Sequence, residues 1–221
     1  MTVNNPWQEE LPFSIYRAGW ILLMIFLMPS LLCELGASVA LASLISTFLA
    51  LGACIGNAGQ LGVRKLSGRD LLAVLGAYLA IIFSLAAVSP IWEELLDSLH
   101  IEYAKNQDMV EILRSSGNVD RVLLFISICI FTPIIEEVLF RRIIYGWFYL
   151  ITPENAVIIT SVLFSLAHFF IAGIPGLLIM GVGFQLIYLL RKNLLTAIML
   201  HGLVNTVASL AQLYLPESML K

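Results

Sequence analysis

The stretch FTPIIEEVLFRR, residues 131–142, places four charged side chains in one of the most apolar regions of this chain: Glu136, Glu137, Arg141 and Arg142. Long uncharged runs lie on both sides of it. A bilayer core about 30 Å thick requires roughly 20 apolar residues per helix, and runs of this order recur along the sequence. The position of these charges, at the end of a membrane helix or inside it, therefore determines what kind of membrane protein this is.

The composition is that of an integral membrane protein. The chain has 221 residues, of which 60% are hydrophobic and 12% charged, and its mean hydropathy is +0.94. The net charge of −3 and the absence of any Lys/Arg cluster larger than Arg64, Lys65 and Arg69 argue against a nucleic-acid partner. We expect one transmembrane domain over residues 1–221, with the motif-bearing core at residues 122–215.

The uncharged runs predict an all-α polytopic transmembrane bundle of about seven spans. Glu34 and Gly36 form the only break between the first two runs, so residues 18–56 can also be one kinked or re-entrant element. The expected spans are Ala18–Cys33, Ala37–Gly56, Leu71–Trp92, Val122–Ile135 continuing into the charged stretch, Asn155–Ile171, Gly173–Leu190 and Asn193–Leu215.

The distribution of Lys and Arg predicts a cytoplasmic N-terminus. Cytoplasmic loops are enriched in these residues, and this orientation places eight of the twelve inside. Three of the other four lie in one long loop, residues 93–121, where acidic residues outnumber them.

Glu136 and Glu137 are expected to lie within the membrane. Counted from Val122 at about 1.5 Å per residue, Glu136 lies about 21 Å along its helix, inside the roughly 30 Å core. An acidic residue at the centre of such a helix costs roughly 2.5–3.5 kcal/mol and normally faces the protein interior. The alternative is that the span simply ends here, with a charge cluster at the cytoplasmic surface to which Arg141 and Arg142 extend.

Helical geometry separates the two carboxylates. Glu137 and Arg141 are four residues apart on one face, in the favourable order for an ion pair, whereas Glu136 points about 100° away. We therefore expect Arg141 to neutralise Glu137, and Glu136 to find its partner on another helix.

Other polar side chains inside the apolar runs are candidates for that partner. His168 and His201 both lie within such runs, and Asn205 follows His201 by four residues on the same face. A carboxylate and an imidazole that converge on one water can take its proton, and a second imidazole with an amide can donate hydrogen bonds to an oxyanion. Glu136, His168 and His201 are also a candidate zinc-binding set, but the chain has no H-E-x-x-H motif, and spacing alone does not decide between metal-activated and carboxylate-activated water.

Three motifs together resemble those of the CPBP family, the CAAX prenyl protease and bacteriocin-processing group also called Abi. EEVLFR (136–141), FSLAH (164–168) and HGLVN (201–205) match the patterns EExxxR, FxxxH and HxxxN in the family's order. The resemblance covers about the last ninety residues; the N-terminal half matches only in hydrophobicity.

The resemblance implies an intramembrane endopeptidase that acts on membrane-associated or lipidated proteins and peptides. Glu136 would be the water-activating base, His168 its partner, and His201 with Asn205 the oxyanion stabilisers. Glu137, Arg141 and Phe164 would support the site. The family has been described both as glutamate-type and as metal-dependent; we expect no cofactor, with zinc as the alternative. The short chain and small loops resemble bacterial members, which places the protein in a bacterial plasma membrane.

Two other functions remain open from the sequence. Intramembrane Glu, His and Arg also mark ion pathways, so a proton-coupled transporter is one alternative, although the internal repeat typical of transporters is not evident. A non-catalytic immunity or scaffold protein with the family's fold is the other.

Overall fold

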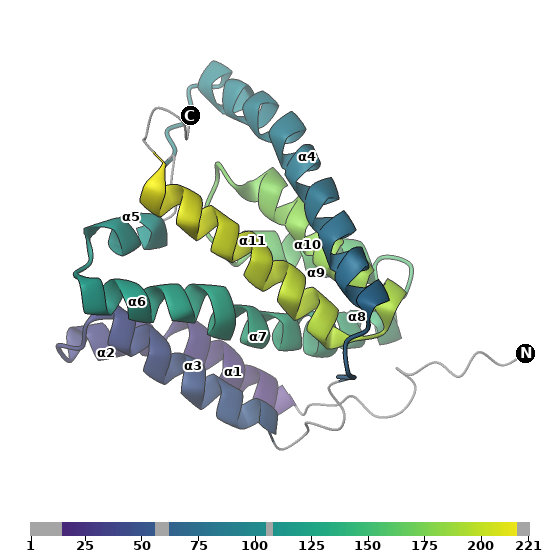
Figure 1. The fold of residues 1–221 in the computed structure, drawn as a ribbon, viewed down its shortest axis with the longest axis horizontal. Coiled ribbons are helices and arrows are strands. Elements are labelled where there is room, and N and C mark those ends of the chain that lie inside the picture. The colour runs from purple at the N-terminus through teal and green to yellow at the C-terminus, as the bar shows by residue number, and fades with distance from the viewer. Residues whose placement is uncertain (1–14, 56–61, 105–107, 216–221) are drawn as a thin grey trace, which may run out of the picture.

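The computed structural model describes residues 15–55, 62–104 and 108–215, and its regular elements there are all helices (Figure 1). The elements and their bounds are α1 (Ile15–Phe26), α2 (Met28–Glu34), α3 (Val39–Ile55), α4 (Gly68–Ser98), α5 (Asp108–Ser115), α6 (Asn118–Ile126), η2 (Ser127–Phe131), α7 (Thr132–Glu137), η3 (Val138–Ile144), α8 (Tyr145–Ile151), α9 (Ala156–Leu166), α10 (Ile174–Arg191) and α11 (Leu194–Tyr214). The segments η2 and η3 are π-helical. The all-α fold class is thus confirmed.

The charged stretch lies inside the longest helix. Elements α6 to α8 are continuous and form one apolar helix of 34 residues, Asn118–Ile151. Glu137 and Arg141 are both fully buried near its middle, and the helix continues beyond them to Ile151. The helix therefore does not end at this stretch, and these two side chains face the protein interior; the depth of the stretch in the membrane stays a prediction.

Each of the other predicted runs also contains a helix. Four helices of the described residues are long and apolar enough to cross a membrane, namely α4, the helix of α6–α8, α10 and α11, and three apolar segments are shorter: Gly19–Glu34, Val39–Ala50 and Ala156–Leu166. The helix of the third run, α4, ends at Ser98 and not at Trp92 as expected, so it includes the first residues of the predicted loop.

Residues 19–55 form a hairpin of two arms and not a single element. The first arm bends at Leu27, just before Pro29 at the start of α2, and α1 and α2 both pack against α3. Gly36 makes the turn between the arms with φ of +91°, a conformation that glycine adopts without a steric penalty.

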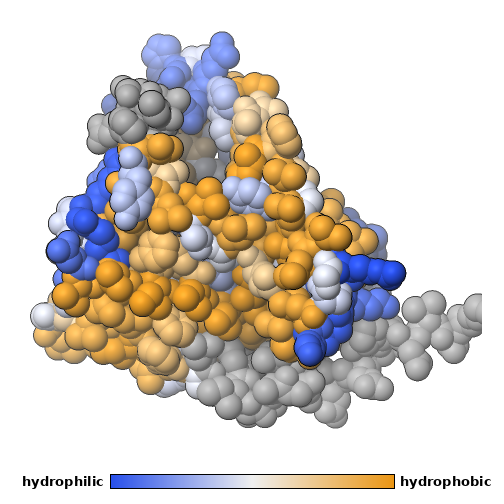
Figure 2. Space-filling view, viewed as in Figure 1, coloured by the Kyte–Doolittle hydropathy of each residue, from blue (hydrophilic) through white to orange (hydrophobic). Residues whose placement is uncertain are grey.

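The surface of the bundle is apolar over a broad band. Figure 2 shows hydrophobic side chains over most of the visible face, with hydrophilic side chains gathered at its edges. Large apolar residues such as Leu72 (71% exposed) and Phe83 (73%) lie on this surface. A soluble monomer rarely exposes so much contiguous apolar area, so the protein is an integral membrane protein.

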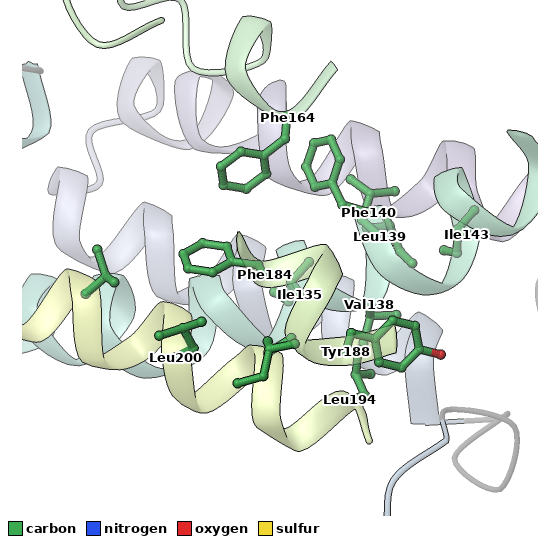
Figure 3. Close-up of a cluster of buried hydrophobic side chains, with 14 of the residues drawn as sticks. Ile135, Val138, Leu139, Phe140, Ile143, Phe164, Phe184, Tyr188, Leu194 and Leu200 are labelled. Carbon is green, nitrogen blue, oxygen red and sulfur yellow. The ribbon is translucent and has the colours of Figure 1, made fainter. Parts of the chain in front are cut away.

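The core is built around the long helix. Its buried residues Ile135, Leu139 and Ile143 belong to one cluster with Phe164 of α9 and Phe184 of α10 (Figure 3). In α11, a Cβ added at Gly202 would lie 2.8 Å from the carbonyl oxygen of Cys129. Glycine therefore allows α11 to approach the backbone of η2, directly beside His201.

Candidate active site

Glu137 and Arg141 form the predicted ion pair. The Arg141 Nε donates to Glu137 Oε2 at 2.7 Å, and both side chains are completely buried. The guanidinium carbon also lies 5.2 Å and 5.7 Å from the ring centroids of Phe164 and Phe184. The pair is thus enclosed by aromatic rings from two other helices, which fixes its position.

The same carboxylate orients His201. The Nδ1 atom of His201 lies 2.9 Å from Glu137 Oε1, and because a carboxylate paired with arginine acts as an acceptor, this nitrogen carries the hydrogen. The ring also stacks on Phe184, with centroids 4.6 Å apart and an interplanar angle of 21°. The remaining ring nitrogen, Nε2, lies 3.8 Å from Glu136 Oε2.

His168 is oriented by the end of its helix. The helix α9 ends at Leu166, so His168 lies in the turn that follows. The sequence had indicated a position within the helix. Carbonyl groups in the last turn of a helix have no backbone partner there, and His168 Nδ1 lies 2.8 Å from the carbonyl oxygen of Phe164. The opposite nitrogen, Nε2, lies 4.0 Å from Glu136 Oε2.

Glu136 thus faces two imidazole nitrogens with one carboxylate oxygen. Its Oε2 atom is buried and has no hydrogen-bond partner among the described residues. The separations of 3.8 Å and 4.0 Å are too long for direct hydrogen bonds. Two histidines on different elements therefore present equivalent nitrogens to the same carboxylate oxygen.

Asn205 is held by a backbone carbonyl that Pro133 leaves without a partner. In a π-helical turn each N–H bonds to the carbonyl five residues earlier, as the Thr132 N–H does to the carbonyl of Ser127. The next residue, Pro133, has no N–H to donate to the carbonyl of Ile128. The Ile128 carbonyl instead accepts a hydrogen bond of 3.0 Å from Asn205 Nδ2. The amide of Asn205 is anchored on one side, and its second N–H is available on the other.

The four predicted site residues line one cavity of about 420 Å³ together with Phe164. The shared cavity is therefore confirmed, whereas its predicted position in the inner half of the membrane stays a prediction. Further lining residues, which the sequence did not indicate, include Ser43, Leu113, Thr132, Met180 and Gln212. These extend the cavity toward α5 and the C-terminal end of α11. Serine, threonine and glutamine give no signal in an apolar helix that would single them out.

Arg142, expected to extend to the membrane surface, makes a contact with another helix that the sequence did not indicate. Its side chain is half-buried, and Nη1 donates to the hydroxyl of Tyr188 on α10 at 2.9 Å. The second arginine of the stretch therefore joins the long helix to α10.

The ligand atoms of the candidate zinc set are farther apart than in a tetrahedral zinc site. Tetrahedral zinc at about 2.0–2.1 Å from each ligand would bring the ligand atoms to about 3.3 Å from one another. The Glu136 oxygen lies 3.8 Å and 4.0 Å from the histidine nitrogens. Among the residues that the structure describes, no three His, Cys, Asp or Glu side chains are placed to hold a metal ion.

Comparisons with known proteins agree with the motifs. Residues 118–207 match the sequence model of the family described as type II CAAX prenyl endopeptidase Rce1-like. The chain is also 33% identical over 106 residues to the membrane-embedded CAAX protease MroQ of Staphylococcus aureus (strain USA300). This alignment covers 45% of the chain and 42% of the relative, so the chain spans less than half of that protein's length. No solved structure matches significantly.

Proposed function

We propose, from the match of residues 118–207 to the Rce1-like CAAX prenyl endopeptidase model and from the three motifs, that this chain is an intramembrane endopeptidase that uses Glu136 to activate water. One observation carries the mechanism: the buried Oε2 of Glu136 makes no hydrogen bond within the described structure and faces Nε2 of both His168 and His201. A general base requires such an unengaged acceptor at a fixed place.

The distances fit one bridging water. A water that hydrogen-bonds at about 2.8 Å to two atoms about 4 Å apart sees them at nearly a right angle, which is acceptable geometry. Glu136 Oε2 and His168 Nε2, 4.0 Å apart, would hold the nucleophilic water between them. His168 thereby orients the water while Glu136 receives its proton.

The reaction then proceeds without a covalent enzyme intermediate. As Glu136 takes the proton, the water oxygen attacks the peptide carbonyl carbon and gives a tetrahedral oxyanion. The second N–H of Asn205 and an N–H at His201 Nε2 stabilise that oxyanion. Collapse breaks the C–N bond, and the proton on Glu136 passes to the leaving amine, which restores the carboxylate.

Glu137 and Arg141 do not contact the substrate but act through His201. Glu137 fixes His201 through Nδ1 at 2.9 Å, and a proton on Nε2 then gives the ring a charge that this carboxylate balances. Arg141 holds Glu137 in place at 2.7 Å. Both are positioning residues for His201.

The surroundings of the cavity favour membrane-associated or lipidated protein and peptide substrates. Its walls include apolar residues from α5, α9, α10 and α11, such as Leu113, Phe170 and Met180. An extended peptide needs partners for its backbone, and Ser43 and Gln212 supply hydrogen-bonding groups in the same cavity. We place the enzyme in a bacterial plasma membrane with its N-terminus in the cytoplasm.

Cleavage of a membrane-peptide library tests this proposal. Purified protein in detergent should generate defined fragments by mass spectrometry, and Glu136→Ala should not. Glu94→Ala is the matched control, because Glu94 is an exposed glutamate of α4 outside the cavity, and it should cleave like wild type. Fragments that persist in Glu136→Ala, or no fragments from the wild-type protein, would refute the proposal.

A further inference from the structure

A second cavity lies on the opposite side of α10 from the candidate active site. It is a groove of about 680 Å³ between α4 and α10. Its α4 wall consists largely of small residues, whose side chains leave the space between the two helices unfilled. The lining residues that carry the argument are Ala73, Gly76, Ala80 and Ser84 of α4, and Val182 and Arg191 of α10.

The length of the groove matches one leaflet of a bilayer. Ala73 and Ser84 are eleven positions apart on one helix, which corresponds to about 16 Å at 1.5 Å per residue. Half of a hydrocarbon core of about 30 Å is about 15 Å. A single extended acyl chain would therefore lie along the whole groove.

The walls suit a hydrocarbon chain better than a peptide. A peptide segment within the membrane needs a hydrogen-bond partner for each backbone group. The polar side chain along the α4 wall is Ser84, and its hydroxyl already donates to the carbonyl of Ala80 at 2.8 Å. The groove thus offers apolar contact and little hydrogen bonding.

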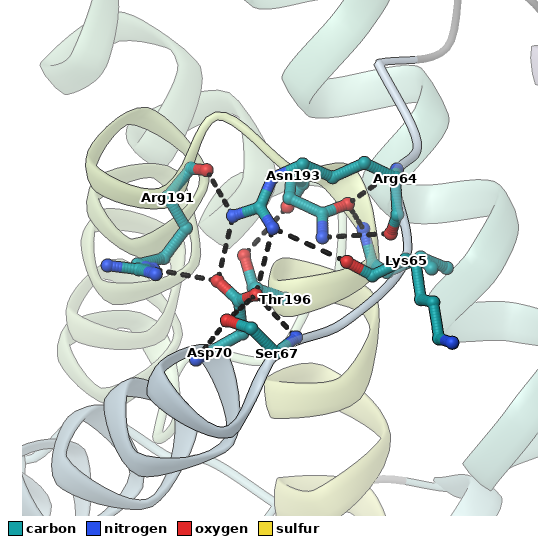
Figure 4. A network of polar contacts seen from close by, with 8 residues as sticks. Arg64, Lys65, Ser67, Asp70, Arg191, Asn193 and Thr196 are labelled. Carbon is teal, nitrogen blue, oxygen red and sulfur yellow. Dashed lines mark hydrogen bonds and ion pairs between the residues drawn. The ribbon is translucent and has the colours of Figure 1, made fainter.

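One end of the groove is cationic. Arg191 lines it, and Arg69, which is exposed, lies four residues before Ala73 on the same stripe of α4. The Nε of Arg191 donates to Asp70 Oδ1 at 2.8 Å, while its two terminal nitrogens point away from this network (Figure 4). Asp70 is itself satisfied by both terminal nitrogens of Arg64, at 2.9 Å each. The network therefore fixes Arg191 in place and leaves part of its guanidinium directed outward.

We propose that this groove binds an anionic phospholipid of the leaflet on the arginine side. Its phosphate lies between Arg69 and Arg191, and one acyl chain extends between α4 and α10. Basic pockets between transmembrane helices on the cytoplasmic side favour anionic head groups, and the distribution of Lys and Arg assigns this end to the cytoplasm.

A lipid in this groove supports α10, the helix that contacts His201 of the candidate active site. The groove-facing side of α10 carries Val182, whereas Phe184 of the same helix stacks on His201 at 4.6 Å. The bound chain fills the space behind α10 and holds Phe184 against the ring. Lipid binding itself does not depend on the proposed peptidase activity, so either can fail without the other.

Lipid titration of the full chain tests the head group. Delipidated protein in detergent is titrated with phosphatidylglycerol or phosphatidylcholine of identical acyl chains, and the bound lipid is counted by native mass spectrometry. Wild type should prefer phosphatidylglycerol. Arg69→Gln should weaken phosphatidylglycerol binding about fivefold and leave phosphatidylcholine binding unchanged.

Filling the groove tests its position. A Cβ at Gly76 meets nothing within 4 Å, so the side chain of Gly76→Leu starts in open space and occupies part of the groove. It should abolish the phosphatidylglycerol preference. Ala86→Leu is the matched control. Ala86 is exposed and lies seven residues after Leu79, on the face of α4 that does not line the groove. If Gly76→Leu elutes as aggregate, Ala80→Leu replaces it.

Equal affinity of wild type for the two lipids would overturn the proposal. Wild-type binding in folded Gly76→Leu or Ala80→Leu would also overturn it, because the anionic lipid would then bind elsewhere.

Discussion

Replacing Arg141 by methionine should destabilise the protein far more than replacing Arg142 by alanine. Methionine keeps most of the volume of Arg141 but leaves the fully buried Glu137 carboxylate without its cation. Removing one partner of a buried ion pair typically costs about 3–5 kcal/mol, because the other charge stays buried and uncompensated. Arg142→Ala removes the part-buried hydrogen bond to Tyr188, which is worth about 1 kcal/mol.

Thermal unfolding in detergent distinguishes these costs. At about 2–4 °C per kcal/mol for a chain of this size, Arg141→Met should lower the unfolding temperature by about 10 °C, and Arg142→Ala by a few degrees at most. The double variant Glu137→Gln/Arg141→Met removes the stranded charge and should recover part of the loss. If Arg141→Met and Arg142→Ala are equally destabilising, or if the double variant is worse than Arg141→Met, the assigned pairing is wrong.

Two further predictions concern the site. Pro133→Ala restores a backbone N–H that competes with Asn205 for the freed carbonyls of η2, so activity should fall roughly tenfold while the unfolding temperature stays level or rises; unchanged cleavage kinetics would contradict the anchoring of Asn205. Chelators should leave peptide cleavage intact, and elemental analysis should find far less than one zinc per purified chain; chelator-sensitive cleavage restored by zinc would make Glu136, His168 and His201 metal ligands instead.

The sequence was sufficient where local periodicity controls the outcome. The separation of four residues between Glu137 and Arg141 holds within almost any helix, and the ion pair follows from it. The single cavity around Glu136, His168, His201 and Asn205 follows from the cost of exposing polar groups to lipid. The apolar runs and the helices coincide because a backbone in lipid must satisfy its polar groups within its own helix.

Tertiary contacts determine the features that the sequence did not reveal. The contact of Glu137 with His201 depends on the close approach of α11, which Gly202 permits. Arg142 is held inside the bundle by Tyr188, a residue 46 positions away, and no local pattern indicates such a partner. His168 lies beyond the end of α9 because the chain turns there, with Phe169 at φ of +49°, although the apolar run continues.

The rate of Glu136→Gln on a peptide that the wild type cleaves is the most direct test of the central claim. Glutamine keeps the shape of the side chain but cannot take the proton of water. Cleavage should fall by roughly 10²–10⁴-fold, the usual contribution of a general base, with the unfolding temperature unchanged. A Glu136→Gln protein that is folded and cleaves at close to the wild-type rate would show that Glu136 does not activate the water.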